Sequence, residues 1–286
     1  MKTIKKLIFL IVILSVFISN AQNFQGKAYY QTKRSFEFKG VKQDSTKAKK
    51  ESIIDDDMKK AIKEMIRKQS EKTYILTFNK SESIYKEEKE LSKPNPAQGG
   101  FMIEITDGNS ELYKNTKENI YIESKEDFGK KFLIKDKIKP FNWEMTKETK
   151  MIGKYLCIKA TTIKMVDDYE ENYTIEEGPK KKEKQKELKI TAWYTPEIPV
   201  GAGPEMYGGL PGLILELHED KMHYVCNKIV MNPSEKIKIV APKKGKEINQ
   251  KDYDELMDKK HKEMMENFKG NRKKGDTSGS VIFIGG

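Results

Sequence analysis

The sequence predicts a mainly β protein built on antiparallel sheet with one or two α-helices. Three observations support this: apolar and polar residues alternate in many short stretches, turn-forming residues separate these stretches, and only two stretches have helical spacing. Strands that follow one another at short spacing pair most simply as antiparallel neighbours.

Nine stretches show the alternation typical of half-buried strands. They cover residues 26–38, 72–79, 82–88, 119–125, 130–136, 154–163, 187–195, 213–219 and 222–231. Because successive side chains of a strand point to opposite faces, each stretch presents one apolar face to a core.

The two helical stretches cover residues 55–72 and 248–270. The first begins with three acids, which suit a helix N-terminus. Apolar residues then recur near helical spacing, namely Met58, Ile62, Met65 and Ile66. The second has an apolar stripe made of Tyr253, Leu256, Met257, Met264, Met265 and Phe268. Gly270 follows this stripe and can end the helix. Methionines in these stripes indicate adaptable packing rather than ligation.

The first 21 residues have the layout of a secretory signal peptide. Lys2, Lys5 and Lys6 precede an apolar core, and Ser19, Asn20 and Ala21 form a small-residue cleavage site. The apolar core is shorter than the roughly 20 residues that a spanning helix needs. The sequence therefore predicts a mature chain that begins near Gln22, lies in the periplasm or is secreted, and has no transmembrane span.

The mature chain is expected to form one domain over residues 22–270, followed by a flexible basic tail at 271–286 whose end could return to the sheet as a short strand. Segments 91–100 and 176–187 have the composition of exposed connections.

Removing the leader takes away three lysines and no acid, so the net charge falls from +11 to +8. The lysines are mixed with acids, which is typical of a solvated surface. The alternative is that they attract the protein to an anionic surface. No nucleic-acid-binding motif accompanies them, so nucleic acid is not an expected partner.

The stretch at residues 206–225 predicts a chain reversal that leads into a core hairpin. Pro211 and Gly212 fit the two central positions of a type II turn, which would give Gly212 a positive φ, and Gly208 and Gly209 add freedom ahead of it. A turn at residues 220–221 would pair Leu217 with Tyr224 and Leu215 with Cys226.

These residues resemble a known family. The run GGLPGLILEL at 208–217, preceded by AWYTPEIPVGAGPEMY at 192–207, is similar to the signature of the GLPGLI family of exported Bacteroidota proteins. Gly26, Ala28 and Tyr30 and the stretch 152–160 extend the similarity, and long lysine-rich insertions depart from it. The resemblance implies a mostly β exported protein with no established activity and no catalytic residue to assign. A more distant similarity to the bowl-like β domain of type II peptide-N-glycosidase F implies a curved sheet that is open, bowl-like or half-barrel in form.

The two cysteines, Cys157 and Cys226, fall on predicted strands. In an oxidising compartment they are candidates for a disulfide, and the alternative is two buried free thiols.

Aromatic residues beside the glycine-rich loop are the binding candidates. Trp193, Tyr194 and Tyr207 supply rigid contact area that suits a peptide, a glycan or another envelope protein, and Glu205 is an acid in the same loop. The alternative for the aromatic residues is packing in or beside the sheet.

Metal, cofactor and catalytic motifs are not predicted. His218 and His223 would be cross-strand partners at a hairpin turn, and with Glu216 they form a weak alternative metal site. The glycine cluster lacks the Gly-Lys-Ser/Thr ending of a phosphate loop, and no nucleophile elbow occurs. The sequence therefore favours a non-enzymatic binding protein, with a peptide or glycan hydrolase and a structural component of an assembly as alternatives.

Overall fold

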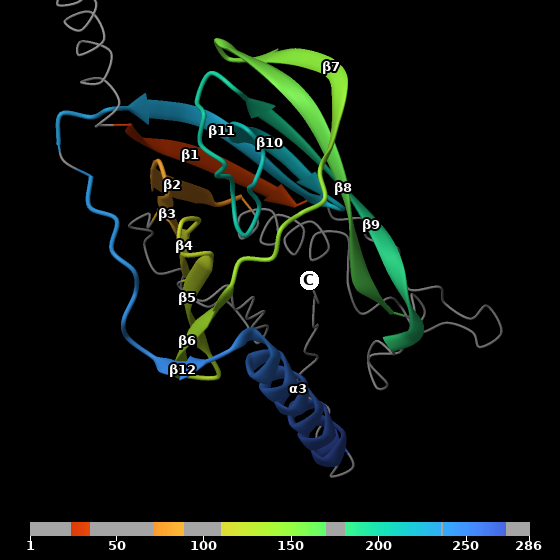
Figure 1. Cartoon of the computed structure of the whole chain (residues 1–286). Coiled ribbons are helices and arrows are strands. Elements are labelled where there is room, and N and C mark those ends of the chain that lie inside the picture. Colours follow the sequence, from red (N-terminus) through yellow and green to blue (C-terminus); the bar gives the residue numbers. More distant parts are fainter. Residues whose placement is uncertain (1–23, 35–70, 89–109, 170–180, 236, 273–286) are drawn as a thin grey trace, which may run out of the picture.

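A computed structural model describes residues 24–34, 71–88, 110–169, 181–235 and 237–272 (Figure 1). In this part of the chain it contains one sheet of 12 strands and one helix, α3 (Gln250–Arg272). The predicted leader, almost all of the predicted first helix and the tail beyond residue 272 lie outside the described residues. The prediction of a mainly β protein with one or two helices is confirmed.

The strands follow the chain in the order β1 (Gln25–Arg34), β2 (Thr73–Asn79), β3 (Glu82–Glu87), β4 (Glu111–Asn115), β5 (Ile120–Asp127), β6 (Lys130–Lys137), β7 (Glu144–Ile152), β8 (Tyr155–Tyr169), β9 (Lys181–Thr195), β10 (Leu213–Glu219), β11 (Met222–Met231) and β12 (Lys246–Ile248). Hairpins join most neighbours, and the spatial order is β12-β6-β5-β4-β3-β2-β1-β11-β10-β9-β8-β7. Strand β1 pairs with both β2 and β11, so it unites the two halves of the chain.

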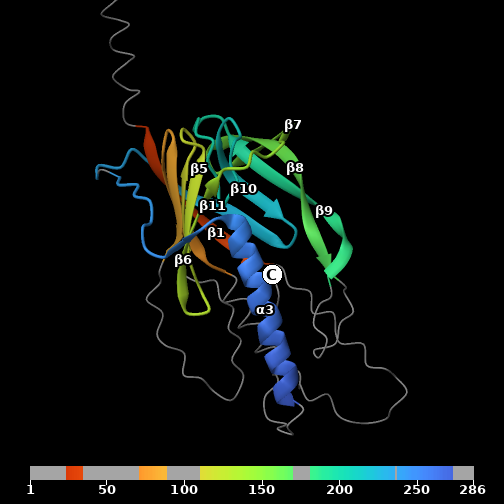
Figure 2. The same cartoon turned by 60° about the horizontal axis from the view of Figure 1, so that its bottom comes forward.

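The sheet is open and strongly curved. β12 and β7 are its two edges, and β12 alone pairs in parallel, with β6. Figure 2 shows the β1–β6 half and the β8–β9 half standing at an angle to each other, with α3 leaving from the space between them. The inner face carries the core, in which Ala28 and Tyr30 are fully buried. The Tyr30 hydroxyl donates to the carbonyl oxygen of Ile214 at 2.6 Å, which joins β1 to β10.

The hairpin of β10 and β11 has the predicted turn and the predicted pair of Leu217 and Tyr224, but its recorded pairs end at Glu216 and Val225, before the predicted pair of Leu215 and Cys226. Leu217 faces Tyr224 and His218 faces His223, and Asp220 has the positive φ of 50° that a tight reversal requires. Leu217 and Tyr224 lie on the buried inner face, whereas His218 and His223 lie on the outer face.

Segment 181–187 is strand rather than the predicted connection. The last residue of β10 faces Ile190 of β9, and β8 and β9 continue beyond this point as a two-stranded ribbon to the pair of Tyr169 and Lys181. Because no strand among the described residues pairs with either edge of the ribbon, its strands bury little and can be polar throughout. The apolar alternation on which the prediction depended is therefore missing there.

Three strands were not predicted: β4, β7 and β12. Strand β12 has only three residues, and in β4 the alternation of apolar and polar residues is too short to indicate a strand. In β7 the register with β8 shifts between Met145 and Thr149, and such a bulge breaks the two-residue period.

Helix α3 begins and ends two residues later than predicted. Asn249 caps it, since its side-chain oxygen accepts from the backbone nitrogen of Asp252 at 2.8 Å. The buried Tyr253 ring meets Phe132 edge-on with centroids 5.5 Å apart, and its hydroxyl donates to Asp127 at 2.5 Å. Leu256 and Met257 also pack against the core. The helix continues past Gly270 to Arg272, and the side chains of Met264, Met265 and Phe268 lie outside the description.

No helix among the described residues is long and apolar enough to cross a membrane.

Candidate functional site

The glycine-rich segment between β9 and β10, residues 196–212, folds back against the inner face as a compact loop. Backbone bonds join it to itself and to β10, as from Gly209 to Gly201 at 3.0 Å and from Ile214 to Ala202 at 3.1 Å. Ile198, Val200, Ala202 and Leu210 are buried. The loop is therefore part of the core rather than an exposed recognition loop.

The predicted type II turn at Pro211 and Gly212 is wrong in one respect, because Gly212 does not have a positive φ. The left-handed residue is Gly209, with φ of 84°. Gly212 is required for space, since a Cβ atom there would lie 2.1 Å from the carbonyl oxygen of Thr195. Pro211 is exposed, and Gly208 forms the bridge with Ala202 that closes the loop.

The loop is held by a buried lysine. The Lys114 ammonium, on β4, donates to the carbonyl oxygens of Glu205 at 2.5 Å, Tyr207 at 3.0 Å and Gly203 at 3.5 Å. Burial lowers the pKa of Lys114 to about 7, and the nearby Glu205 opposes this change. Glu205 itself has a positive φ of 49°, unusual for a residue with a side chain. Three carbonyl groups that converge on one ammonium thus fix residues 203–207 on the sheet.

Aromatic rings cover the same loop. Tyr207 stacks on Phe141 with centroids 4.9 Å apart, and the Trp143 indole donates to the Gly208 carbonyl oxygen at 2.9 Å. Tyr207 is only 3% exposed, and burial raises the pKa of its hydroxyl. Its role in this structure is packing.

The predicted aromatic binding patch does not assemble. Trp193 and Tyr194 are neighbours in β9 and therefore point to opposite faces of the sheet. Tyr194 is buried on the inner face, where its hydroxyl lies 3.2 Å from the Met145 sulfur. Of the three predicted aromatic residues, only Trp193 reaches the outer face.

On the outer face Trp193 is part of a charged network that we call the Trp193 surface: Lys150, Trp193, Glu216, His218 and His223. Glu216 faces Trp193 across β9 and β10 and accepts from Lys150 at 2.7 and 2.8 Å. The Lys150 nitrogen also lies 4.3 Å from the centroid of the Trp193 ring, a cation–π contact. His218 Nε2 is 2.7 Å from Glu216, and the His218 and His223 rings are 4.3 Å apart.

Contacts within the Trp193 surface determine the charge state of Glu216 and the pKa of His223. Burial by itself would raise the pKa of Glu216, but hydrogen bonds from Lys150 and His218 lower it, so the carboxylate is ionised at neutral pH. Burial and the neighbouring His218 lower the pKa of His223. The surface therefore combines a fixed carboxylate, a fixed ammonium, two imidazoles and a half-buried indole.

Sequence reasoning missed Lys150 and Lys114, two lysines that organise the two regions. Nothing distinguishes either of them from the many other lysines of the chain, and Lys150 lies in a strand whose bulge hides the alternation.

The weak alternative metal site is not supported. Among the described residues, no group of three or more His, Cys, Asp or Glu side chains is placed to hold a metal ion. His218 and His223 do meet as predicted, but Glu216 is engaged by Lys150 and His218.

A small pocket adjoins the Trp193 surface. The turn between β7 and β8 lies over β10 and β11 and leaves a volume of about 200 Å³, whose apolar lining comes from Ile152, Tyr155, Leu215, Cys226 and Ile229. Lys150 and Ile152 are two residues apart on β7 and therefore lie on the same face of that strand, which places the pocket beside the Trp193 surface.

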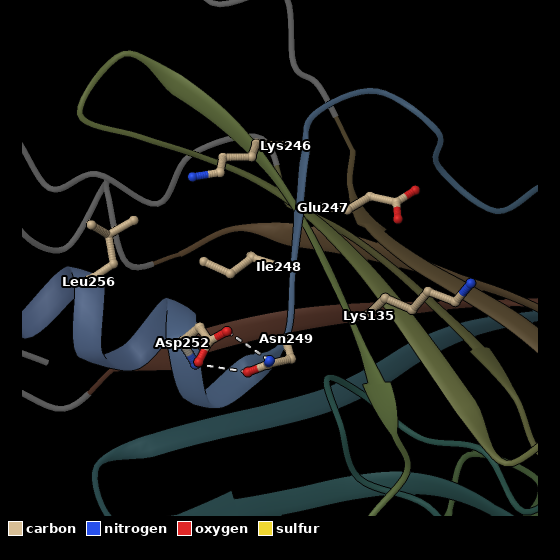
Figure 3. A pocket seen from close by; sticks show the side chains of 7 residues that line it. All are labelled: Lys135, Lys246, Glu247, Ile248, Asn249, Asp252 and Leu256. Atoms are coloured by element: carbon tan, nitrogen blue, oxygen red, sulfur yellow. Dashed lines mark hydrogen bonds between the residues drawn. The ribbon is translucent and has the colours of Figure 1, made fainter.

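A larger depression of about 620 Å³ lies between β12, β6 and the start of α3. Figure 3 shows that Lys135 and Glu247 extend to one side of β12, whereas Lys246 and Ile248 extend to the other. Its polar side chains do not converge on a common point, so they are not arranged to bind one ligand.

The predicted disulfide is not formed, because Cys157 and Cys226 are both free and buried. Cys157 lies in β8 and Cys226 in β11, with β9 and β10 between them. Neighbouring strands are about 4.8 Å apart, so the intervening strands separate the pair by more than the roughly 7 Å that a disulfide tolerates between Cα atoms.

Thiol titration of the denatured, non-reduced protein is therefore expected to give two thiols per chain. In the native protein the reaction should be slow at neutral pH, because burial raises the pKa of Cys157 to about 11 and that of Cys226 to about 12. The protein reduced before denaturation is the control. Absence of thiols in the non-reduced sample alone would contradict this arrangement.

A family model described as "Protein of unknown function (Porph_ging)" matches residues 143–216, the segment from Trp143 through β7, β8, β9 and the loop into β10. No curated protein sequence matches the chain significantly.

Two solved structures of PNGF-II, in two crystal forms, are similar to the chain. Their sequence identities are 16% and 17% and their TM-scores 0.45 and 0.44. The similarity covers 82% of this chain but 33% and 32% of those chains, so this chain spans about a third of their length. Similarity at this level indicates neither a shared activity nor a shared substrate. The chain thus matches a family model of unknown function over residues 143–216, a segment that includes Lys150, Trp193 and Glu216 of the Trp193 surface.

Proposed function

We propose that the protein is an exported, non-enzymatic binding module of the cell envelope that recognises a partner through the Trp193 surface. The observation that carries the proposal is the Glu216 carboxylate, which Lys150 and His218 hold beside the half-buried indole of Trp193. The signal-peptide layout of residues 1–21 supports export, and the resemblance of residues 192–217 to the GLPGLI signature agrees with it.

The geometry suits recognition because its charged groups are oriented before a partner arrives. Groups that are already fixed lose less conformational entropy on binding, which leaves more of the contact energy as affinity. Tryptophan is among the residues that most often dominate binding energy at protein interfaces. Trp193 lies on the face opposite its buried strand neighbours Ala192 and Tyr194. On this outer face its ring contacts the ammonium groups of Lys150 and Lys159.

Replacement of Trp193 by alanine is expected to weaken capture of the natural partner at least thirtyfold in Kd, about 2 kcal/mol for a central hot-spot side chain. The measurement uses the mature protein immobilised against envelope extract, with bound proteins and glycans quantified by mass spectrometry. A partner enriched by the wild type is then titrated against both proteins.

Phe128→Ala is the matched control, because Phe128 is a 49% exposed aromatic at the turn between β5 and β6, outside the Trp193 surface. Both variants must unfold at wild-type temperature for the comparison to hold. The proposal fails if Trp193→Ala and wild type retain the same set of molecules with the same affinity.

A further inference from the structure

We infer that the small pocket beside the Trp193 surface is its anchor subsite, and that the partner is an acidic peptide segment with one large apolar side chain. This inference rests on the proposed function, since it names the partner of the same surface. It comes from the size of the pocket, its apolar lining and the sign of the charges around it.

The volume of the pocket suits one side chain. Sites for drug-sized molecules occupy roughly 300–1,000 Å³, whereas this pocket has about 200 Å³. Its apolar walls come from two sides, Ile152 and Tyr155 from the hairpin turn and Leu215 and Ile229 from the sheet. Insertion of a single large apolar side chain into such a cleft is the usual form of an interface hot spot.

The charges beside the pocket are positive. Lys154 and Lys228 line it and are exposed, and no acidic residue is among its lining residues. Their ammonium groups lie 5.3 Å from the Tyr155 ring and 4.8 Å from the Tyr29 ring, and neither lysine forms an ion pair with any residue in the described ranges.

Nearby acids are already engaged. The Glu197 carboxylate accepts from the backbone nitrogen of Leu156 at 2.9 Å, and Glu216 is held by Lys150 and His218. The complementary partner therefore carries carboxylates on both sides of its apolar anchor. An anionic membrane surface would match the charge but supplies no single apolar side chain for the cleft, so the observations favour a peptide.

The test is selection of a random heptapeptide library displayed on phage against the mature protein, followed by fluorescence anisotropy on the selected peptides. The expected peptides carry an excess of Asp and Glu and one large apolar residue. Replacing that residue by alanine should weaken binding at least tenfold, and so should the double variant Lys154→Glu, Lys228→Glu. Bound peptide should also slow labelling of Cys226 by a methanethiosulfonate at pH 9, because Cys226 lines the pocket.

The control is Lys117→Glu, Lys139→Glu, which changes the net charge equally at two exposed lysines outside the pocket and should leave affinity unchanged. An empty selection, peptides without the acidic excess, or equal loss in both double variants would overturn the inference. Binding to anionic vesicles that is lost in Lys154→Glu, Lys228→Glu, with no peptide selected, would assign the lysines to lipid instead. If Trp193→Ala still abolishes capture of an envelope partner in any of these cases, the proposed function stands and only the acidic-peptide inference fails.

Discussion

Gly212→Ala is expected to destabilise the protein by about 3 kcal/mol or more, because an added Cβ atom would lie 2.1 Å from the Thr195 carbonyl oxygen and 3.0 Å from Pro196. The obstacle is backbone on the neighbouring strand rather than a flexible side chain. Relief would require β9 and β10 to separate where Leu213 pairs with Thr195. Urea unfolding followed by far-ultraviolet circular dichroism measures the loss.

Gly209→Asn is the matched control three residues earlier. Gly209 has a φ of 84°, but nothing lies within 4 Å of a Cβ atom there. Asparagine enters the left-handed region more readily than other residues with a side chain, so the cost should stay near 1 kcal/mol. The reverse ranking, with Gly212→Ala tolerated and Gly209→Asn severe, would mean that space does not require glycine at 212 and that the left-handed conformation of Gly209 is the stricter requirement.

This pair of glycines shows what the sequence could and could not reveal. The run at 206–213 correctly indicated a chain reversal before a core strand, because glycine and proline punctuate structure locally. That Gly212 lies against a neighbouring strand depends on Thr195, which precedes it by 17 residues and belongs to no local pattern around it. The register of the following hairpin was predictable because its turn and its apolar alternation are both local.

The candidate site was less predictable for the same reason. Trp193 was identified from its residue type, and the cross-strand meeting of His218 and His223 from spacing across a turn. Tyr207 was assigned to binding but packs against Phe141, from the segment that follows β6, and no local pattern connects the two. The pairing of Lys150 with Glu216 joins residues far apart in the chain, and the chain has 55 lysines and arginines from which to choose.

The stability of the protein is expected to rise with pH above neutrality because of Lys114, relative to a Lys114→Met variant. The folded-state pKa of about 7 lies below the usual value of 10.5, so the unfolded chain binds more protons between these values. Burial therefore opposes the folded state most strongly below about pH 7, and this cost disappears as pH rises toward 10.5. The gap in unfolding free energy between wild type and Lys114→Met should change in favour of wild type by about 3 kcal/mol between pH 6 and pH 9.5.

The comparison with the variant removes the contribution of other groups. Burial raises the pKa of Cys157 and Cys226, so these thiols lower stability as pH increases, but they do so equally in both proteins. Lys117→Met, at an exposed lysine in the next turn, is the matched control for the loss of one lysine. A gap that does not change with pH for Lys114→Met would show that the carbonyl groups of Gly203, Glu205 and Tyr207, with the Glu205 charge, compensate the ammonium fully for its loss of water. In that case Lys114 would stay charged in the folded protein, and the loop would be held by a permanent cation rather than by a titrating one.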